Sequence, residues 1–355
     1  MKETMVLLLI CVMFCGVIAI EKEQVLQRWN SIVFVKAGNI WVVGMDGNDQ
    51  TKLTNGKKCD HPVFSPDGKK IAFNSVDFKN GNIYIMDVDG SGIIKLTNNS
   101  AFNDYPKFSP NGMRIAYMSN RDGSWEIYIM DIDGSNQTQL TINKNCGLGL
   151  PIFSNDGNKM AFVSSEGNNG KWTNSINILN LSNNNIENTI NNAAWWGNIT
   201  CGSSFSDNSN DFIYSKIDDY GYTNLYITDL TDNTSIQLDD DYGCYINPLF
   251  SASSSCIAYV NSSTNQLIIR SIDYQSKSLI SDKINTQEEP EFSPDGKYIV
   301  YVADINMNWE IFISAILNKE QKRLTNGGGS SPSFAPMLIN GKLLDYYGHW
   351  HEIGE

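Results

Sequence analysis

The stretch PVFSPDGKKIAFNSVDFKNGNIYIMDVDGSGIIKLT, residues 62–97, decides the fold of this chain because it recurs along the sequence. Its first half returns five times: PKFSPNGMRIAY from Pro106, PIFSNDGNKMAF from Pro151, SSFSDNSNDFIY from Ser203, PLFSASSSCIAY from Pro248 and PEFSPDGKYIVY from Pro290. The repeated Phe stands at positions 64, 108, 153, 205, 250, 292 and 334, so the mean step over six intervals is 45 residues. A period of that size indicates a solenoid or a propeller.

Each repeat predicts four short strands. The Phe-Ser strand and the IAF strand are joined by Pro-Asp-Gly or Asn-Asp-Gly, and a segment such as NIYIMDVDG from Asn82 leads through Asp-Gly to a short strand around Leu-Thr. These turn residues favour tight hairpins. The third strand is apolar on both faces, as in Ile83 to Met86, so both faces of each sheet must be covered. Sheets stacked radially into a ring meet that requirement.

The number of repeats predicts an all-β, seven-bladed β-propeller of four-stranded antiparallel blades. Third-strand segments occur seven times, at Ile40, Ile83, Ile127, Ile176, Leu225, Leu267 and Ile311. Residues 31–54 contain strands two to four but no first strand, whereas the far end around SPSFAP has a first strand without a continuation. We therefore expect a propeller over 31–345, closed by pairing of the N- and C-terminal strands in a composite blade of 31–54 and 331–345. Residues 346–355 form a tail.

The first residues predict export. Residues 6–20 read VLLLICVMFCGVIAI, an apolar run too short to span a bilayer comfortably. We interpret residues 1–19 as a signal peptide, with an uncleaved membrane anchor as the alternative, and residues 20–30 as a lead-in segment. The chain is then periplasmic or extracellular. Its net charge of −13 argues against nucleic acid and anionic lipid as partners.

The pattern FSPDGxxIAF…IYxMDxDGxxxxLT resembles the WD-repeat-like propeller units of the TolB family, and also the propeller domains of prolyl oligopeptidases and the tricorn protease. It covers residues 31 to about 336, and is most specific over 62–97 and 106–141. The resemblance implies a rigid exported propeller that binds proteins, which in TolB proteins are a peptidoglycan-associated lipoprotein and colicins. TolB proteins carry an α/β domain before a six-bladed propeller. Here only about 30 residues precede the first strand, so the chain is similar to the family without being TolB itself.

No catalytic constellation stands out in the sequence. The Gly-x-Ser-x-Gly elbow of a hydrolase is missing, and the three histidines, His61, His349 and His351, are too few for the metal site of the sugar lyases that resemble this chain in outline. The Asp-x-Asp-Gly runs from Asp87 and Asp131 are typical of turns, because the later ligands of a calcium loop are missing. We expect no catalytic residue, metal or cofactor.

Two sets of residues are candidates for binding. The connections that enter the first strands should line one mouth of the ring, where loops from several rigid blades converge. The candidates there are Asp60, His61, Asp104, Tyr105, Tyr245, Glu288 and Glu289. The longest repeat adds Trp172, Trp195 and Trp196, which could stack on sugars or anchor a protein, or pack between blades. Trp41, Trp125 and Trp309 lie in or beside third strands and are expected in the core.

The cysteines leave one pairing to consider. Five remain after the leader, so at least one is unpaired unless it bridges two molecules. Cys201 and Cys244 occupy matching connections of adjacent blades and are the candidates for a disulfide, provided that their Cα atoms lie within about 7 Å.

Together these observations favour a non-enzymatic, monomeric scaffold for protein partners of the cell envelope or extracellular space. The alternative is a propeller that binds or degrades a polysaccharide.

Overall fold

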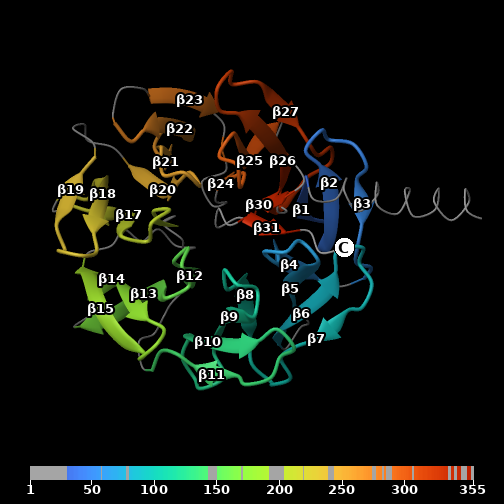
Figure 1. The fold of residues 1–355 in the computed structure, drawn as a ribbon, viewed down its shortest axis with the longest axis horizontal. Helices are drawn as coiled ribbons and strands as arrows, with labels where there is room; N and C mark the ends of the chain where they lie inside the picture. Colours follow the sequence, from blue (N-terminus) through green and yellow to red (C-terminus); the bar gives the residue numbers. More distant parts are fainter. Residues whose placement is uncertain are drawn as a thin grey trace, which may run out of the picture.

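The computed structural model describes residues 30–352 apart from 57, 77–79, 143–149, 169–170, 192–203, 219, 239–243, 274–276, 282–283, 285–289, 306–307, 335–336, 340–341 and 345–349. Seven four-stranded antiparallel sheets follow one another around a ring, which confirms the predicted seven-bladed propeller (Figure 1). We number the blades 1 to 7 from the composite one. In each blade the strand given first below is innermost and the strand given last is at the outer edge.

The first four blades contain the following strands. Blade 1 is β28 (Ser330–Phe334), β1 (Ser31–Lys36), β2 (Asn39–Gly44) and β3 (Thr51–Lys52); blade 2 is β4 (Cys59–Phe64), β5 (Lys70–Val76), β6 (Gly81–Asp87) and β7 (Ile94–Lys95); blade 3 is β8 (Asn103–Phe108), β9 (Arg114–Ser119), β10 (Glu126–Asp131) and β11 (Thr138–Gln139); blade 4 is β12 (Ile152–Phe153), β13 (Lys159–Asn168), β14 (Lys171–Asn180) and β15 (Asn185–Asn191).

The last three blades repeat the arrangement. Blade 5 is β16 (Ser204–Phe205), β17 (Asp211–Ile217), β18 (Thr223–Asp229) and β19 (Ser235–Gln237); blade 6 is β20 (Tyr245–Phe250), β21 (Cys256–Asn261), β22 (Gln266–Ser271) and β23 (Lys277–Ser281); blade 7 is β24 (Glu291–Phe292), β25 (Tyr298–Ile305), β26 (Asn308–Ala315) and β27 (Gln321–Arg323).

The core lies between blades, because each sheet buries both faces. In β5, Ile71 and Phe73 join the apolar cluster shared with blade 1, whereas Ala72 between them joins the cluster shared with blade 3. Successive side chains of a strand point to opposite faces, so one apolar run serves two interfaces. This is why the IAF and IYIM segments do not alternate with polar residues.

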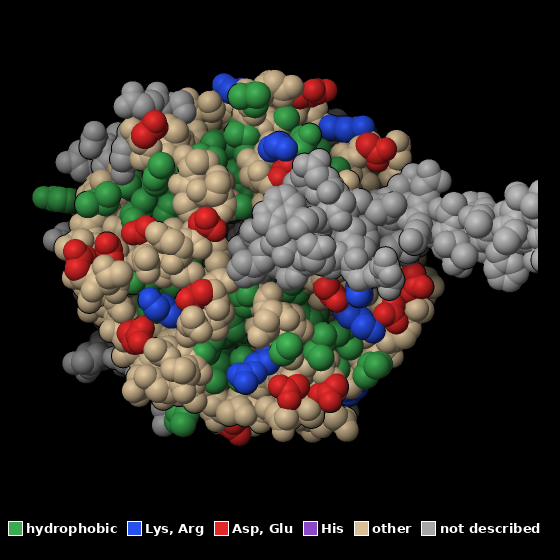
Figure 2. All heavy atoms as spheres, in the orientation of Figure 1, with side chains coloured by type: hydrophobic (Ala, Val, Ile, Leu, Met, Phe, Trp, Pro, Cys, Tyr) green, Lys and Arg blue, Asp and Glu red, His purple; other side chains and the backbone are tan. Residues whose placement is uncertain are grey.

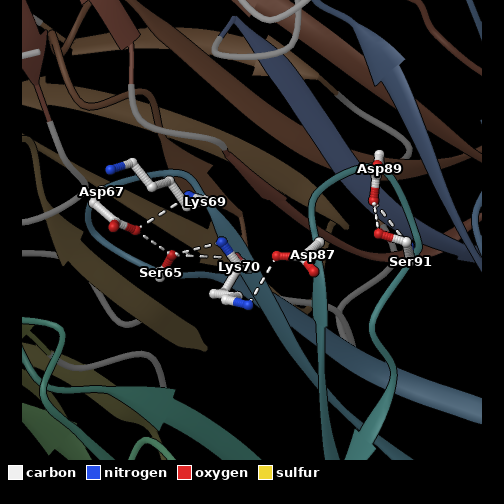
Figure 3. A network of polar contacts seen from close by, with 7 residues as sticks. All are labelled: Ser65, Asp67, Lys69, Lys70, Asp87, Asp89 and Ser91. Atoms are coloured by element: carbon white, nitrogen blue, oxygen red, sulfur yellow. Dashed lines mark hydrogen bonds and ion pairs between the residues drawn. The ribbon is translucent and has the colours of Figure 1, made fainter. Parts of the chain in front are cut away.

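The Ser-Pro-Asp-Gly turn is held by its own side chains, as Figure 3 shows for blade 2. Ser65 Oγ donates to Asp67 Oδ1 over 2.6 Å and accepts the Lys70 N–H over 2.9 Å, while Asp67 Oδ1 also accepts the Lys69 N–H. The same contacts recur at Ser109 and at Ser154. The repeated motif is therefore accounted for by turn structure.

The second Asp-Gly turn also ties neighbouring blades together. Gly134 has a φ of +85°, and a Cβ atom there would lie 2.8 Å from the carbonyl oxygen of Leu96 in blade 2. Gly90 makes the matching approach to Leu53 of blade 1, at 2.9 Å. Glycine at these positions thus serves both the turn and the close contact with the preceding blade.

We expect Gly134→Ala to destabilise the ring more than Gly123→Ala. Both glycines have positive φ, so each variant carries backbone strain of about 1–2 kcal/mol. Only at Gly134 does the new methyl group also collide with backbone, since nothing lies within 4 Å of the corresponding position at Gly123. Urea unfolding of the two variants measures the difference, and equal midpoints would refute this role of the contact with Leu96.

The two faces of the ring are defined by its connections. Hairpins between second and third strands lie beside the connections that enter first strands: Asn120 N–H donates to Phe102 O, and Ile284 N–H donates to Asn265 O. We call this side the entry face. The turns between first and second strands and between third and fourth strands lie on the opposite side, the exit face.

The ends of the chain close the ring in blade 1. β28 pairs antiparallel with β1, with Ile32 opposite Phe334 and Val33 opposite Ser333. Around this blade, side chains of β1 and β2 pack against blade 7 on one side and blade 2 on the other. Closure by the two terminal strands was predicted and is confirmed.

A three-stranded antiparallel sheet follows β28 and has no counterpart in the sequence analysis. It contains β29 (Met337–Ile339), β30 (Lys342–Leu344) and β31 (Trp350–Glu352), and its labelled strands project onto the middle of the ring in Figure 1. The structure thus completes blade 1 with residues 330–334 alone, where the sequence suggested 331–345. It also places a strand within residues 346–355, which we had described as a tail.

Candidate binding rim

Two innermost strands carry the same irregularity at the entry face. In β4 the pairing register shifts between Asp60 and Val63, and in β8 it shifts between Asp104 and Lys107. At each shift one residue adopts a left-handed conformation directly before a proline: His61 has a φ of +48° and Tyr105 a φ of +52°. Bulges of this kind redirect side chains at the inner ends of strands.

The two bulges bring residues of different blades into contact. His61 Nδ1 lies 2.9 Å from Asp104 Oδ1, and the imidazole stacks on the Tyr105 ring with centroids 3.9 Å apart. The carboxylates fix the backbone, since Asp60 Oδ1 accepts the His61 N–H and Asp104 Oδ1 accepts the Tyr105 N–H. We call Asp60, His61, Asp104 and Tyr105 the binding rim. These residues belong to the first strands themselves, where the sequence had placed them in loops.

The chemistry of the binding rim follows from these contacts. An ionised Asp104 can only accept, so it holds a proton on His61 Nδ1 and leaves Nε2 as an acceptor in the neutral imidazole. About a quarter of each side chain of this pair is exposed, 27% for His61 and 24% for Asp104. Left-handed non-glycine residues are strained, and such strain is concentrated at functional sites. The rim therefore offers a rigid, polar and aromatic surface.

A third copy of the irregularity was missed by the sequence analysis. Asn247 in β20 has a φ of +52°, precedes Pro248, and lies at a register shift between Ile246 and Leu249. Its side chain is buried, at 4% exposed, so this copy adds no surface to the rim. In all three copies the left-handed residue directly precedes the repeated proline.

The other predicted binding residues are placed differently or lie outside the described residues. Tyr245 is 3% exposed, and its ring packs edge-on against Tyr259 in the core between blades 5 and 6. Trp172 belongs to β14, but the position of its side chain is not described. Outside the described residues lie Glu288, Glu289, Trp195, Trp196 and Cys201. Cys244 is a free cysteine in the structure, which does not support the predicted pairing with Cys201.

One tryptophan expected in the core is exposed instead. Trp309 begins the third strand of blade 7 at the entry face and is 46% exposed, so the core prediction is wrong for this residue. Trp309 pairs with Asp304, which lies near the end of β25. The apolar character of Trp309 alone did not reveal this exposure.

A cationic side chain next to the rim is held within blade 3. The Arg121 guanidinium lies 4.3 Å from the centre of the Tyr128 ring and donates to the Tyr117 hydroxyl over 2.7 Å. Burial raises the pKa of Tyr117 to about 12, although the positive charge of Arg121 acts in the opposite direction. Tyr117 thus stays neutral at physiological pH and accepts the hydrogen bond.

Over the described part of the chain, His, Cys, Asp and Glu side chains form no group of three or more that could hold a metal ion. Within the same residues, no helix has the length and hydropathy needed to cross a membrane.

Comparison with known proteins places the chain among propellers. The family model described as "TolB beta propeller domain" matches residues 33–243. No curated protein matches the sequence significantly. Among solved structures, TolB from Acinetobacter baumannii is 17% identical with a TM-score of 0.56, covering 86% of this chain and 81% of its own.

Two enzymes have similar structures. An oligogalacturonate lyase in complex with manganese is 11% identical over 82% of each chain, with a TM-score of 0.56. A puromycin-hydrolyzing peptidase of Mycobacterium tuberculosis is 9% identical with a TM-score of 0.61, covering 85% of this chain and 54% of its own. At these identities the similarity concerns the fold alone.

Proposed function

Since the chain belongs to the family of TolB beta propeller domains, we propose that it is a non-enzymatic scaffold whose binding rim recognises a protein partner. The observation that carries the proposal is the contact between blades 2 and 3, where His61, Asp104 and Tyr105 are fixed by two strained bulges. A rim that is already in place before binding costs a partner little ordering entropy. Protein recognition is also the function that the resemblance to TolB proteins implies.

Affinity capture with matched variants tests this function. The full chain is immobilised beside His61→Ala/Tyr105→Ala and beside Met113→Ala, a substitution at a 67%-exposed residue in a turn of the exit face. We expect one protein of an envelope extract to be retained by the parent chain and Met113→Ala and lost from the rim variant. Melting temperatures verify that all three chains fold. Retention of every partner by the rim variant would contradict the proposal.

The alternative is a polysaccharide-degrading propeller, suggested by the similarity to the lyase structure. Incubation with oligogalacturonate and other polysaccharides, with and without added manganese, tests it directly. Release of unsaturated sugar at a rate that depends on His61 would establish an enzyme and exclude the scaffold.

Export is part of the proposed function, because the envelope partners of such a scaffold lie outside the cytoplasm. Residues 1–30 fused to a reporter enzyme that is active only after export should give an active reporter. Mass spectrometry of the mature N-terminus then separates a cleaved signal from an anchor, and an inactive reporter would overturn the assignment.

A further inference from the structure

The exposed aromatic side chains of the ring lie on one face. Among the described residues the exposed large aromatic side chains are Phe102, Tyr220, Tyr222 and Trp309, with exposed fractions of 38%, 83%, 42% and 46%. Each lies in or beside a hairpin between second and third strands or a connection that enters a first strand, which puts all four on the entry face.

The exit face differs in character. Its most exposed apolar side chains are aliphatic, Met113 between β8 and β9 and Leu317 between β26 and β27. Figure 2 shows one face of the ring, on which the described acidic and basic side chains are scattered among neutral ones. Within the described residues, the exposed aromatic side chains therefore belong to one side of the molecule.

Three basic side chains at the entry-face ends of strands or hairpins are already engaged. Lys36 Nζ donates to Asn326 O over 2.7 Å and lies over the Trp41 ring, Arg121 is held between Tyr117 and Tyr128, and Lys216 lies over the Tyr226 ring. Within the described residues, no cation lies over the rings of Phe102, Tyr220 or Trp309.

The entry face also carries acidic side chains. Asp60 and Asp104 stand partly exposed at the binding rim, and the whole chain carries a net charge of −13. The face thus presents aromatic rings and carboxylates, both of which attract cations.

The chain enters β1 and leaves β28 on the other face. β1 begins and β28 ends at the exit face, where Ile32 is paired with Phe334. The segments before β1 and after β28 therefore start on the side opposite the aromatic rings. A partner can approach the entry face without passing either point of attachment.

We propose that the entry face docks a basic segment of the protein partner, with lysine or arginine cations over Tyr220, Trp309 and Phe102 and near the rim carboxylates. This inference rests on the proposed function and specifies the chemistry of its partner. The aliphatic stems of lysine and arginine pack on the ring faces, while their charges stay near carboxylates and water. The rings belong to blades 3, 5 and 7, so the segment lies across the ring.

Selection from a random peptide display library on the immobilised full chain tests the proposal. We expect the enriched peptides to contain lysine or arginine beside aliphatic residues, and a synthetic consensus peptide to bind more weakly as salt is raised. Tyr220→Ala/Trp309→Ala should weaken that peptide about tenfold or more. Met113→Ala/Leu317→Ala, which removes exposed apolar side chains from the exit face, should change its affinity less than about twofold.

Three outcomes would overturn the inference. The first is enrichment of acidic peptides, and the second is an equal loss of peptide binding in both double variants. The third is that the chain binds a neutral oligosaccharide through Tyr220 and Trp309 and binds no peptide. The affinity capture described under the proposed function distinguishes failure of the basic-segment inference from failure of the scaffold function. A partner that requires His61 and Tyr105 but carries no basic segment would support the scaffold and refute the basic partner.

Discussion

A chain that ends at Gly329 is expected to lose most of its stability, because it lacks β28 and can no longer close the ring. β28 is hydrogen-bonded to β1 and lies against β4 on one side and β24 to β26 on the other. Loss of its ladder bonds and exposure of the apolar clusters beside blade 1 should cost about 4–6 kcal/mol. Differential scanning calorimetry should show a melting temperature lower by about 10 °C or more.

The matched control is a chain that ends at Pro336. It retains β28 and removes only the separate sheet of β29 to β31. We expect it to melt within a few degrees of the full chain, since that sheet is not part of any blade. If both truncated chains melt alike, closure by β28 does not determine stability.

Glu310→Ala is expected to give the second large effect, because this buried carboxylate fixes the approach to β28. Glu310 is 3% exposed, and its oxygens accept hydrogen bonds from Thr325 Oγ1 at 2.5 Å and from the N–H groups of Gly327 and Gly328 at 2.8 and 3.2 Å. The variant leaves three donors unpaired, and we expect a loss of about 2–4 kcal/mol in urea unfolding. Glu310→Gln, which can still accept from the two glycines, should lose less.

The same residue makes stability depend on pH. Burial raises the pKa of Glu310, but hydrogen bonds from Thr325, Gly327 and Gly328 outweigh it and hold the pKa below its ordinary value. A lowered pKa means that the stabilisation is present above the ordinary carboxyl pKa and is lost as the pH falls through the lowered value. The difference in unfolding free energy between the parent chain and Glu310→Gln should therefore shrink in acid. If the difference in unfolding free energy stays constant as the pH falls through the lowered pKa, this role for the charge is contradicted.

Glu310 also shows how far turn residues can be understood from the sequence. The run Gly327-Gly328-Gly329 reads as a flexible loop, yet each glycine has a specific role. Gly327 and Gly328 have φ values of +92° and +93° and point their N–H groups at Glu310, and a Cβ at Gly329 would lie 2.9 Å from Ile311. Glycine adopts the positive φ values of Gly327 and Gly328, and allows the close contact of Gly329 with Ile311, without strain.

The repeated Leu-Thr pair has a similar explanation. Thr141 Oγ1 accepts the Ile127 N–H over 2.9 Å and donates to Glu126, and Thr54, Thr97 and Thr325 accept from the matching third strands. These threonines are buried, so the hydroxyl satisfies a backbone donor that the short outer strand leaves unpaired. The sequence showed that the Leu-Thr pair is repeated, but only the structure showed which hydrogen bonds its threonine makes.

The repeat unit and the number of repeats could be predicted from the sequence. The turn residues, the strands that are apolar on both faces and the repeat period are local properties of the sequence. Seven sheets with two apolar faces each bury both faces when they form a closed ring. The sharing of blade 1 by the two chain ends followed from the same count, because one end lacked a first strand and the other end supplied it.

The four residues of the binding rim were already candidates in the sequence, but their contacts with one another could be seen only in the folded chain. His61 and Asp104 are 43 residues apart, and their contact depends on two bulges and on the packing of blades 2 and 3. Both Tyr245 and Trp309 lie near the entry-face end of a strand, yet Tyr245 is buried against Tyr259, whereas Trp309 is 46% exposed. Local pattern specifies which strands form, whereas contacts between blades depend on distances that no single repeat contains.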